Sequence, residues 1–372
     1  MRKALSLLLA ICMALTLTLS TVSCDSFITL EDDEETRKES SSKENTTNTT
    51  IETTESTSTK ETSIDEVSTA EETTTEDTTL PDDTEDYPFK QTVESFFPDY
   101  AENAITIAEG EVSSKNVALV DLSSNKIIAS RQSGKGNPIY PASLTKVMTL
   151  IVVYENLKST SALNEKLTLS EAVVNKMIEE NSSGYGFKAG DVLTVNELIH
   201  AVMLYSDGTA CITLAEYISG SEAKFVELMN AKAKEMGLLN TNFTNCTGLH
   251  NQYHFSTAQD LAAMMAYAMK NTFCANVITA QSLKIGSHFR PDEGVSYNMY
   301  NQVFNSLKNA QPSTCTIYGG KTGLTDEAKY CLITYSKTKD GKEYILVTMG
   351  AETATLRNQD QIDILNKYVK AN

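Results

Sequence analysis

The chain has 372 residues, enough for one large globular domain or two smaller ones. Its formal net charge is −18, but residues 25–90 alone contain 21 acidic and five basic side chains, so most of the charge belongs to that segment. The remainder, residues 91–372, is only mildly acidic and has no stripe of Lys and Arg. This balance argues against a nucleic acid as the partner of the folded part.

The first 23 residues have the features of a secretory signal sequence. Arg2 and Lys3 give it a positive start, an apolar run follows, and small residues precede Cys24. This order is typical of a signal that is cleaved after export. The stretch that ends at Cys24 also resembles the lipobox of bacterial lipoproteins, with Thr21 where leucine or valine is usual, which implies lipidation of the cysteine. Plain cleavage with an incidental Cys24 is the alternative.

Residues 24–95 are expected to form a disordered acidic linker. They are almost entirely polar or charged, and aliphatic residues such as Ile51 and Ile64 stand alone. Such a segment buries too little apolar surface to offset the entropy that it would lose on folding. Behind a lipidated Cys24 it would hold the following domain away from the membrane. A tail with no spacing role is the alternative.

From about residue 96 the composition becomes globular, and strand patterns stand at both ends of this region. Two β-type runs, 117–122 and 126–130, are joined by Ser123-Ser124-Asn125, which predicts a hairpin. Three more strand-like runs lie near the C-terminus, at 317–322, 330–336 and 344–350. Between the last two, Asp340-Gly341 is a strong hairpin signal.

The region between these strands carries helical patterns. An apolar run after Pro141 predicts a buried helix, because proline suits the first turn. Further helices are predicted at 167–217 with a break at 181–186, and at 221–236, 256–270, 276–282 and 358–369. The predicted fold class is therefore α/β (α+β), with an antiparallel sheet built from both chain ends and an inserted helical subdomain.

The globular region contains five cysteines: Cys211, Cys246, Cys274, Cys315 and Cys331. No two of them show the Cys-x-x-Cys spacing of a zinc or redox site. We expect them to be buried, small apolar side chains. One disulfide is the alternative in an exported protein.

Ser143 and Lys146 stand three positions apart at the start of the apolar run. On a helix these positions share a face, so the hydroxyl and the amine would meet. A hydroxyl beside an amine is one way to build an activated nucleophile. Ser-x-x-Lys alone occurs often by chance, so the prediction depends on what the rest of the chain adds.

Two further motifs follow in chain order, Ser206-Asp207-Gly208 and, on a predicted strand, Lys321-Thr322-Gly323. Ser-x-x-Lys, Ser-x-Asn and Lys-Thr-Gly in this order are the signature of penicillin-binding proteins and serine β-lactamases. The chain closely resembles the low-molecular-mass D-alanyl-D-alanine carboxypeptidases, peptidase family S11, over about residues 105–372. The stretches that carry this resemblance are 141–149, 187–191, 256–262 and 319–332.

The resemblance implies a β-lactamase/transpeptidase-like fold, with residues 96–372 as a DD-peptidase catalytic domain. It implies a serine-type D-Ala-D-Ala carboxypeptidase that removes the terminal D-alanine of peptidoglycan stem peptides through an acyl-enzyme on Ser143. Lys146 would be the base, because burial, the helix dipole and nearby Lys321 disfavour its charged form. Ser206 would relay a proton toward the leaving D-alanine. β-Lactams would be covalent inhibitors, and no cofactor or metal ion is implied.

The resemblance also implies a set of substrate-binding residues. Lys321 would add positive potential, and Thr322 would hydrogen-bond the terminal carboxylate of the substrate. Gly323 would let the strand backbone approach the substrate closely. The backbone N–H of Leu324, with that of the nucleophile, would hold the oxyanion. Arg357 would help to hold the terminal carboxylate, with a surface arginine at a helix start as the alternative.

Gly208 departs from the family pattern, which has an asparagine at this position. Glycine offers no side-chain hydrogen bond, a loss of about 1.5–3 kcal/mol for one charged contact. Asp207, Thr209 or a water would have to substitute, or activity would be weakened. A catalytically impaired penicillin- or muropeptide-binding protein is therefore the first alternative. A serine β-lactamase is less favoured, because Glu235 and Asn240 have the wrong spacing for its deacylation motif.

Other kinds of site find little support in the sequence. His250 and His254 are four positions apart but lack the glutamate of His-Glu-x-x-His, so no metal site is expected. The sequence contains no Gly-x-Ser-x-Gly motif, the motif that would indicate an α/β-hydrolase. We expect an exported protein at the outer face of the cytoplasmic membrane or in the cell wall. Many relatives carry a further C-terminal domain and anchor helix, whereas this chain stops at Asn372, which favours an anchor at Cys24.

Overall fold

The computed structural model describes residues 97–132, 139–290, 293, 296–308 and 310–370. The predicted signal sequence, Cys24 and the predicted linker lie outside the described residues. In the part of the chain that is described, no helix combines the length and the apolar character needed to cross a bilayer. The domain boundary expected at residue 96 stays a prediction.

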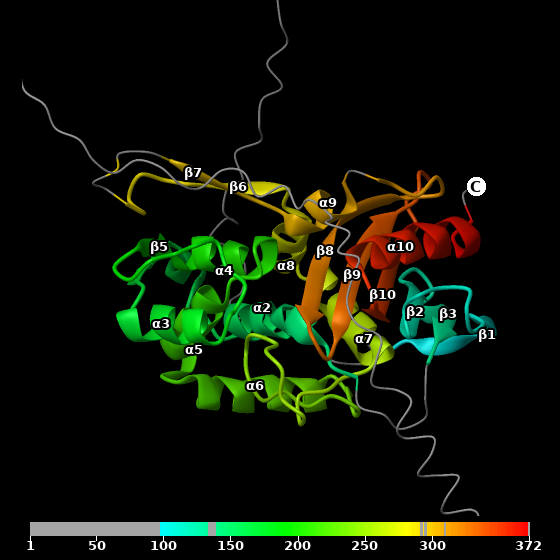
Figure 1. Ribbon diagram of the computed structural model, residues 1–372, viewed down its shortest axis with the longest axis horizontal. Coiled ribbons are helices and arrows are strands. Elements are labelled where there is room, and N and C mark those ends of the chain that lie inside the picture. Colours follow the sequence, from blue (N-terminus) through cyan, green and yellow to red (C-terminus); the bar gives the residue numbers. More distant parts are fainter. Residues whose placement is uncertain (1–96, 133–138, 291–292, 294–295, 309, 371–372) are drawn as a thin grey trace, which may run out of the picture. The chain divides into compact units, whose positions relative to one another are not determined.

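One six-stranded sheet is built from both ends of the described chain, which confirms the predicted architecture. Its order is β1-β3-β2-β10-β9-β8 (Figure 1). The N-terminal strands are β1 (Asp99–Thr106), β2 (Asn116–Asp121) and β3 (Lys126–Arg131). The C-terminal strands are β8 (Thr316–Thr325), β9 (Lys329–Lys337) and β10 (Glu343–Ala351). Neighbouring strands are antiparallel except β1 and β3, which are parallel.

Both predicted hairpins are present, whereas β1 was not predicted. The carboxylate of Asp121 accepts the N–H of Ser123 at 2.9 Å, which closes the turn between β2 and β3. In the turn between β9 and β10, Gly341 has a φ of 86° and the Lys342 N–H donates to Thr338 Oγ1 at 3.0 Å. Strand β1 has only exposed and half-buried side chains, so it shows no alternating apolar face that a pattern would reveal.

Alternate side chains of the central strands enter two separate hydrophobic cores. On β2, Ala118 and Val120 belong to the core of the helical portion, whereas Val117 and Leu119 pack with α10 (Ala354–Tyr368). Helix α7 (Ala258–Lys270) covers the first face of the sheet and α10 covers the second (Figure 1). Because successive side chains on a strand point to opposite faces, strands buried on both sides read as continuous apolar runs.

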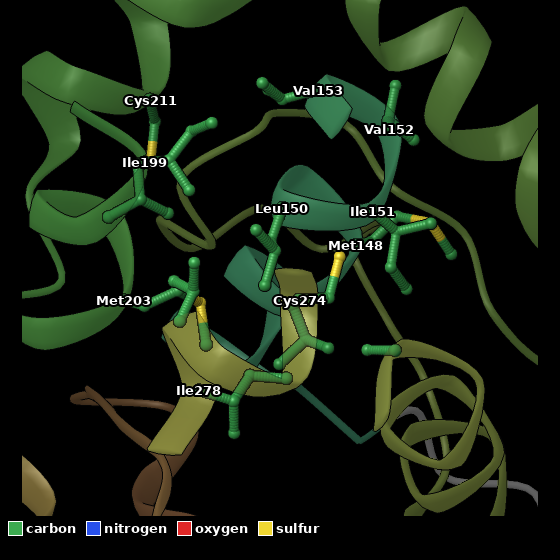
Figure 2. Close-up of a cluster of buried hydrophobic side chains, with 14 of the residues drawn as sticks. Met148, Leu150, Ile151, Val152, Val153, Ile199, Met203, Cys211, Cys274 and Ile278 are labelled. Atoms are coloured by element: carbon green, nitrogen blue, oxygen red, sulfur yellow. The ribbon is translucent and has the colours of Figure 1, made fainter. Parts of the chain in front are cut away.

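The inserted helical portion is organised around α2 (Lys146–Glu155), every residue of which is buried. Figure 2 shows Met148 and Leu150 of this helix beside Ile199 of α4 (Val195–Leu204) and Ile278 of α8 (Thr272–Thr279). Burying one such aliphatic side chain contributes about 1.5–3 kcal/mol. The other helices of this portion are α3 (Glu171–Glu179), α5 (Gly208–Ser219) and α6 (Glu222–Glu235).

Short elements connect these helices to the sheet. They are the 3₁₀ turns η1 (Ala142–Thr145) and η2 (Thr160–Asn164), the short helix α9 (Gln302–Leu307), and two small hairpin sheets, β4 (Lys166–Thr168) with β5 (Val192–Thr194) and β6 (Ser282–Ile285) with β7 (Tyr297–Tyr300).

Three helix predictions are wrong at their ends. The helix expected at 358–369 begins at Ala354, because Thr353 caps it by accepting the Leu356 N–H at 3.2 Å. The helix expected at 276–282 lies at Thr272–Thr279, because Asn271 caps it by accepting the Cys274 N–H at 3.0 Å. The helical region expected at 167–217 begins with β4 and is interrupted by β5. These strands have three residues each and pair only with one another, so they carry no pattern long enough to recognise.

The segment that carries Ser143 begins as the 3₁₀ turn η1 and continues into α2, rather than forming one α-helix from Pro141 as predicted. A second backbone segment, residues 244–254, packs against this turn. A Cβ atom at Gly248 would lie 2.0 Å from the carbonyl oxygen of Ala142. Ala142 itself has a φ of 47°, a conformation that non-glycine residues rarely adopt.

His254 joins these two segments. The Thr244 N–H donates to His254 Nδ1 at 3.2 Å, so the ring proton lies on Nε2, which donates to Thr145 Oγ1 over 2.8 Å. Burial lowers the pKa of His254 to about 4, so the ring is neutral at pH 7. His254 is thus a buried residue that hydrogen-bonds to the turn that carries Ser143.

Gly248→Ala should lower the free energy of unfolding by at least about 2 kcal/mol, because the new methyl group must displace backbone atoms of Ala142. Gly190→Ala is the matched control. Gly190 also has a positive φ, +86°, but a Cβ atom there would meet nothing within 4 Å, so only the backbone strain of about 1–2 kcal/mol applies. Urea unfolding of both variants measures the difference. Equal losses would contradict this account of the packing.

Candidate active site

A cleft of about 640 Å³ opens between the turn η1, the loop before α5 and strand β8. Six of the eight predicted catalytic and substrate-binding residues line it: Ser143, Ser206, Thr322, Gly323, Leu324 and Arg357. The other two, Lys146 and Lys321, do not line the cleft, and each is only 1% exposed. The fold therefore gathers at one place residues that are far apart in the sequence.

The side chains of Ser143 and Lys146 are in contact. The Lys146 amine donates to Ser143 Oγ at 3.1 Å and to the carbonyl oxygen of Thr247 at 2.5 Å. Burial lowers the pKa of Lys146, because removal from water disfavours the charged amine. A neutral amine can accept a proton, so the pair has the arrangement of a nucleophile with its base.

Strand β8 reaches the nucleophile through a glycine. A Cβ atom at Gly323 would lie 3.2 Å from the carbonyl oxygen of Pro141 and 3.3 Å from the backbone nitrogen of Ser143. These distances are tighter than ordinary van der Waals contacts. The absence of a side chain at Gly323 therefore lets strand β8 pack against η1. The sequence resemblance had instead implied that Gly323 makes room for the substrate.

Arg357 lines this cleft and Lys321 is buried next to its Thr322 wall, and in the described residues neither forms an ion pair. Burial first, then the nearby charge of Lys146, lower the pKa of Lys321 well below its ordinary value. Its amine donates to the carbonyl oxygen of Thr322 at 2.9 Å. In the described residues no ion pair involves Lys146, Lys321 or Arg357. The unpaired guanidinium of Arg357 thus gives the cleft a positive charge, which suits an anionic ligand.

Ser206 has a hydroxyl that is available to a ligand. Its φ of 60° is left-handed, an uncommon and strained conformation for a residue other than glycine. The hydroxyl oxygen is buried and has no hydrogen-bond partner among the described residues. An unpaired buried hydroxyl costs free energy, and a bound substrate with a donor or an acceptor at this point would recover it.

Gly208 does not face the cleft. A Cβ atom there would lie 2.1 Å from Ser182 Oγ and 2.7 Å from Met177 Sδ, so an asparagine side chain would not fit without displacing residues 182–184. The Gly208 N–H donates to the carbonyl oxygen of Ser183 at 3.0 Å. Ser183 and Gly184 line the cleft in its place.

Neither residue expected to substitute for the missing asparagine reaches the cleft wall. The carboxylate of Asp207 accepts the N–H groups of Ala210 at 2.7 Å and Tyr185 at 2.8 Å, so it caps α5 and fastens the neighbouring loop. Thr209 is buried and does not line the cleft either. Neither side chain therefore lines the cleft where a substrate would meet it, and the Asp207 carboxylate is already bonded to backbone N–H groups.

Arg357 lies in the first turns of α10 and lines the cleft. It is 3% exposed, so it is not the surface arginine of the alternative reading. Further cleft residues were missed by the sequence analysis, chiefly Gln302, Asn305 and Ser306 of α9 together with Tyr330. Helix α9 has only six residues, too few for a helical pattern to appear.

The remaining candidate residues take structural positions. All five cysteines of the globular region are buried thiols, as predicted, and no disulfide joins any of them. His250 packs edge-on against the ring of Tyr140, with ring centroids 4.7 Å apart. Within the described residues, no three His, Cys, Asp or Glu side chains lie close enough to share a metal ion.

Comparison with known proteins identifies relatives of the same kind. The chain is 33% identical over 253 residues to D-alanyl-D-alanine carboxypeptidase DacF of Bacillus subtilis, over 68% of this chain and 61% of that protein. It is 30% identical over 270 residues to D-alanyl-D-alanine carboxypeptidase DacC of Escherichia coli, over 70% of this chain and 62% of that protein. The chain thus spans somewhat over half the length of these relatives.

The fold has a counterpart among solved structures. The Streptomyces K15 DD-transpeptidase superposes with a TM-score of 0.59 and 25% sequence identity, over 70% of this chain and 98% of that one. Residues 103–353 match the sequence profile of Peptidase_S11, described as D-alanyl-D-alanine carboxypeptidase. This profile match spans most of the chain and contains the Ser143–Lys146 pair and the Lys321-Thr322-Gly323 strand. The chain therefore belongs to peptidase family S11, the D-alanyl-D-alanine carboxypeptidases.

Proposed function

We propose that the protein is a serine-type D-Ala-D-Ala carboxypeptidase that removes the terminal D-alanine from peptidoglycan stem peptides. The observation that carries the proposal is the 3.1 Å contact between the Lys146 amine and Ser143 Oγ at an electropositive cleft. Family membership supports the same reaction. No cofactor or metal ion takes part in the proposed chemistry.

The reaction begins with attack by Ser143 Oγ on the carbonyl carbon of the penultimate D-alanine, while its proton passes to the neutral amine of Lys146. The backbone N–H groups of Ser143 and Leu324 stabilise the oxyanion of the tetrahedral intermediate. The C–N bond then breaks, and the leaving D-alanine takes a proton through Ser206. Water hydrolyses the acyl-enzyme and regenerates the Ser143 hydroxyl.

The terminal carboxylate of the substrate binds at the positive side of the cleft. Thr322 donates a hydrogen bond to it, Lys321 contributes positive potential from behind the strand, and Arg357 contributes charge and N–H donors. These cations have no carboxylate partner of their own in the described structure, so their charge is available to the ligand. A stem peptide with a terminal carboxylate should therefore bind more tightly than an acyl compound that lacks one.

Ser183 and Gly184 line the cleft together with Ser206, where the family pattern has an asparagine side chain. A catalytically impaired penicillin- or muropeptide-binding protein is the second candidate function, because Gly208 removes that side-chain amide. A serine β-lactamase remains the third. All three use Ser143 as the nucleophile and differ in the fate of the acyl-enzyme.

The placement of the protein is also a proposal. Residues 1–23 act as a signal sequence, and residues 24–95 form a linker between a lipidated Cys24 and a catalytic domain at 96–372. This arrangement holds the cleft at the outer face of the cytoplasmic membrane, within reach of peptidoglycan. Export agrees with the proposed action on peptidoglycan stem peptides, and two relatives are named D-alanyl-D-alanine carboxypeptidases.

Purified protein should become covalently labelled on Ser143 by a fluorescent penicillin and should release D-alanine from diacetyl-Lys-D-Ala-D-Ala. Both signals should disappear in Ser143→Ala, because no other group supplies the acyl-enzyme bond. Mass spectrometry of the adduct and an assay for free D-alanine measure them. Label without D-alanine release would support the impaired binding protein, and rapid penicillin hydrolysis without an adduct would support a β-lactamase.

The acylation rate of Ser143 should depend on the protonation of Lys146. A protonated amine cannot accept the serine proton, so the rate should fall about tenfold per pH unit below the pKa of Lys146. Because burial lowers that pKa, the fall should begin below the value of about 10.4 of a free lysine. Penicillin acylation measured from pH 5 to pH 10 gives the profile. Lys146→Arg, which stays protonated, should lose about 10²–10⁴ in rate, and a midpoint near pH 10 in the unmodified chain would contradict the base assignment.

Cells grown with radiolabelled palmitate should incorporate label into the protein through Cys24, since lipidation of that cysteine is the proposed anchor. The variant Cys24→Ser should carry no label and should leave the membrane fraction. Label that persists in Cys24→Ser would overturn the proposed anchor.

A further inference from the structure

Arg357 is held entirely by uncharged acceptors. Its Nε and Nη2 atoms donate to Asn358 Oδ1 at 3.1 and 2.8 Å, and Nη2 also donates to Ser306 Oγ. Nη1 donates to the carbonyl oxygen of Cys331 over 3.5 Å. No ion pair in the described part of the chain includes this guanidinium. Its positive charge is therefore fixed in position but not neutralised by the protein.

Arg290 shows how the same chain treats a structural arginine. Its Nε and Nη2 atoms donate to the two carboxylate oxygens of Asp191 at 2.9 and 2.8 Å. That bidentate pair cancels the charge and ties the loop before β5 to the segment after β6. Arg290 does not line the cleft, whereas Arg357 does. The difference between the two arginines lies in the charge of their partners.

Asn358 joins the guanidinium to helix α9. Its side-chain oxygen accepts from Arg357, and its side-chain nitrogen donates to the backbone carbonyl of Ser306 at 2.6 Å. The amide must be oriented this way, because only its NH₂ group can donate to a carbonyl. Ser306 and Arg357 both line the cleft. The neutral side chain of Asn358 thus fixes the position of Arg357 relative to helix α9.

This arrangement leaves one donor of Arg357 for a ligand. A guanidinium has five N–H groups, and the contacts above use four of them, which leaves one on Nη1. Ser306 Oγ accepts from Arg357 and donates to Asn358 Oδ1 over 3.5 Å, so Ser306 is also tied to the amide. A carboxylate at this point would accept from the remaining Nη1 N–H. Burying an uncompensated cation is costly, and an anion from outside removes that cost.

We propose that Asn358 is a positioning residue that, with Ser306, holds Arg357 in the cleft without neutralising it, so that the guanidinium binds the terminal carboxylate of the substrate. The inference rests on the proposed function, because it takes the D-alanine carboxylate as the anion. An aspartate at this position would keep the contact with Arg357 but would supply the protein's own carboxylate. It would then compete with the substrate for the charge.

The test measures binding without chemistry. In full-length Ser143→Ala protein, NMR titration gives the affinity for diacetyl-Lys-D-Ala-D-Ala and for the same peptide with a C-terminal amide. We expect the carboxylate peptide to bind about tenfold more tightly or better, as a charge-assisted contact would give. Adding Asn358→Asp should reduce this preference to about twofold or less, mainly through loss of affinity for the carboxylate peptide.

Gln359→Glu is the matched control. It adds one negative charge at the next position of α10, where the side chain is exposed and contacts Asp363 rather than the cleft. It should keep the full preference. Ser306→Ala removes one donor and one acceptor without adding charge, so it should lower the preference in part. Thermal unfolding checks that each variant is folded, and Ser306→Ala decides the question if Asn358→Asp is not.

The outcomes separate the inference from the proposed function. A preference that survives Asn358→Asp, or that falls equally in Gln359→Glu, overturns the positioning role. An equal loss of affinity for both peptides also overturns it, since a merely structural change would act on both. If Ser143→Ala protein does not prefer the carboxylate peptide at all, Arg357 is no carboxylate site and the inference fails. D-alanine release by the unmodified chain, measured separately, reports on the carboxypeptidase alone.

Discussion

The structure depends on keeping an amine out of water beside a hydroxyl. Lys146 is held between Ser143 Oγ and the carbonyl oxygen of Thr247, inside a core that surrounds α2 on every side. Burial disfavours the protonated amine and outweighs the nearby thiols of Cys211 and Cys246 and the carboxylate of Asp207, which favour it. The apolar residues of α2 thus do two things at once, since they hold the helix in place and lower the pKa of its first residue.

Close backbone approach makes this burial possible. Three segments meet at Ser143: the turn η1, residues 244–248 and strand β8. Gly248 and Gly323 are the contact points, and a Cβ atom at either would press on the backbone of η1. The left-handed φ of Ala142 and of Ser206 shows that the surrounding structure forces conformations that the residues do not favour. Packing in the two hydrophobic cores offsets the free-energy cost of these strained conformations.

The loop 182–184 and the motif at 206–208 form one unit. Gly208 leaves space that Ser182 fills, Gly184 leaves space beside the carboxylate of Asp207, and two hydrogen bonds to backbone groups join the segments. A substitution on one side would therefore require a change on the other. Ser183, Gly184 and Ser206 all line the cleft, and so does Arg357, which uncharged groups hold in place.

The sequence by itself determined the sheet built from both chain ends, the buried helix after Pro141 and six of the residues that line the cleft. These follow from local periodicity and short motifs, which act over a few residues. Only the tertiary structure decided that Gly208 faces Ser182, that Asp207 is a cap, and that Asn358 and Ser306 hold Arg357. The Gly208–Ser182 and Asn358–Ser306 contacts join residues far apart in the sequence, and the direction of all these side chains depends on how the helices pack, which no local pattern encodes.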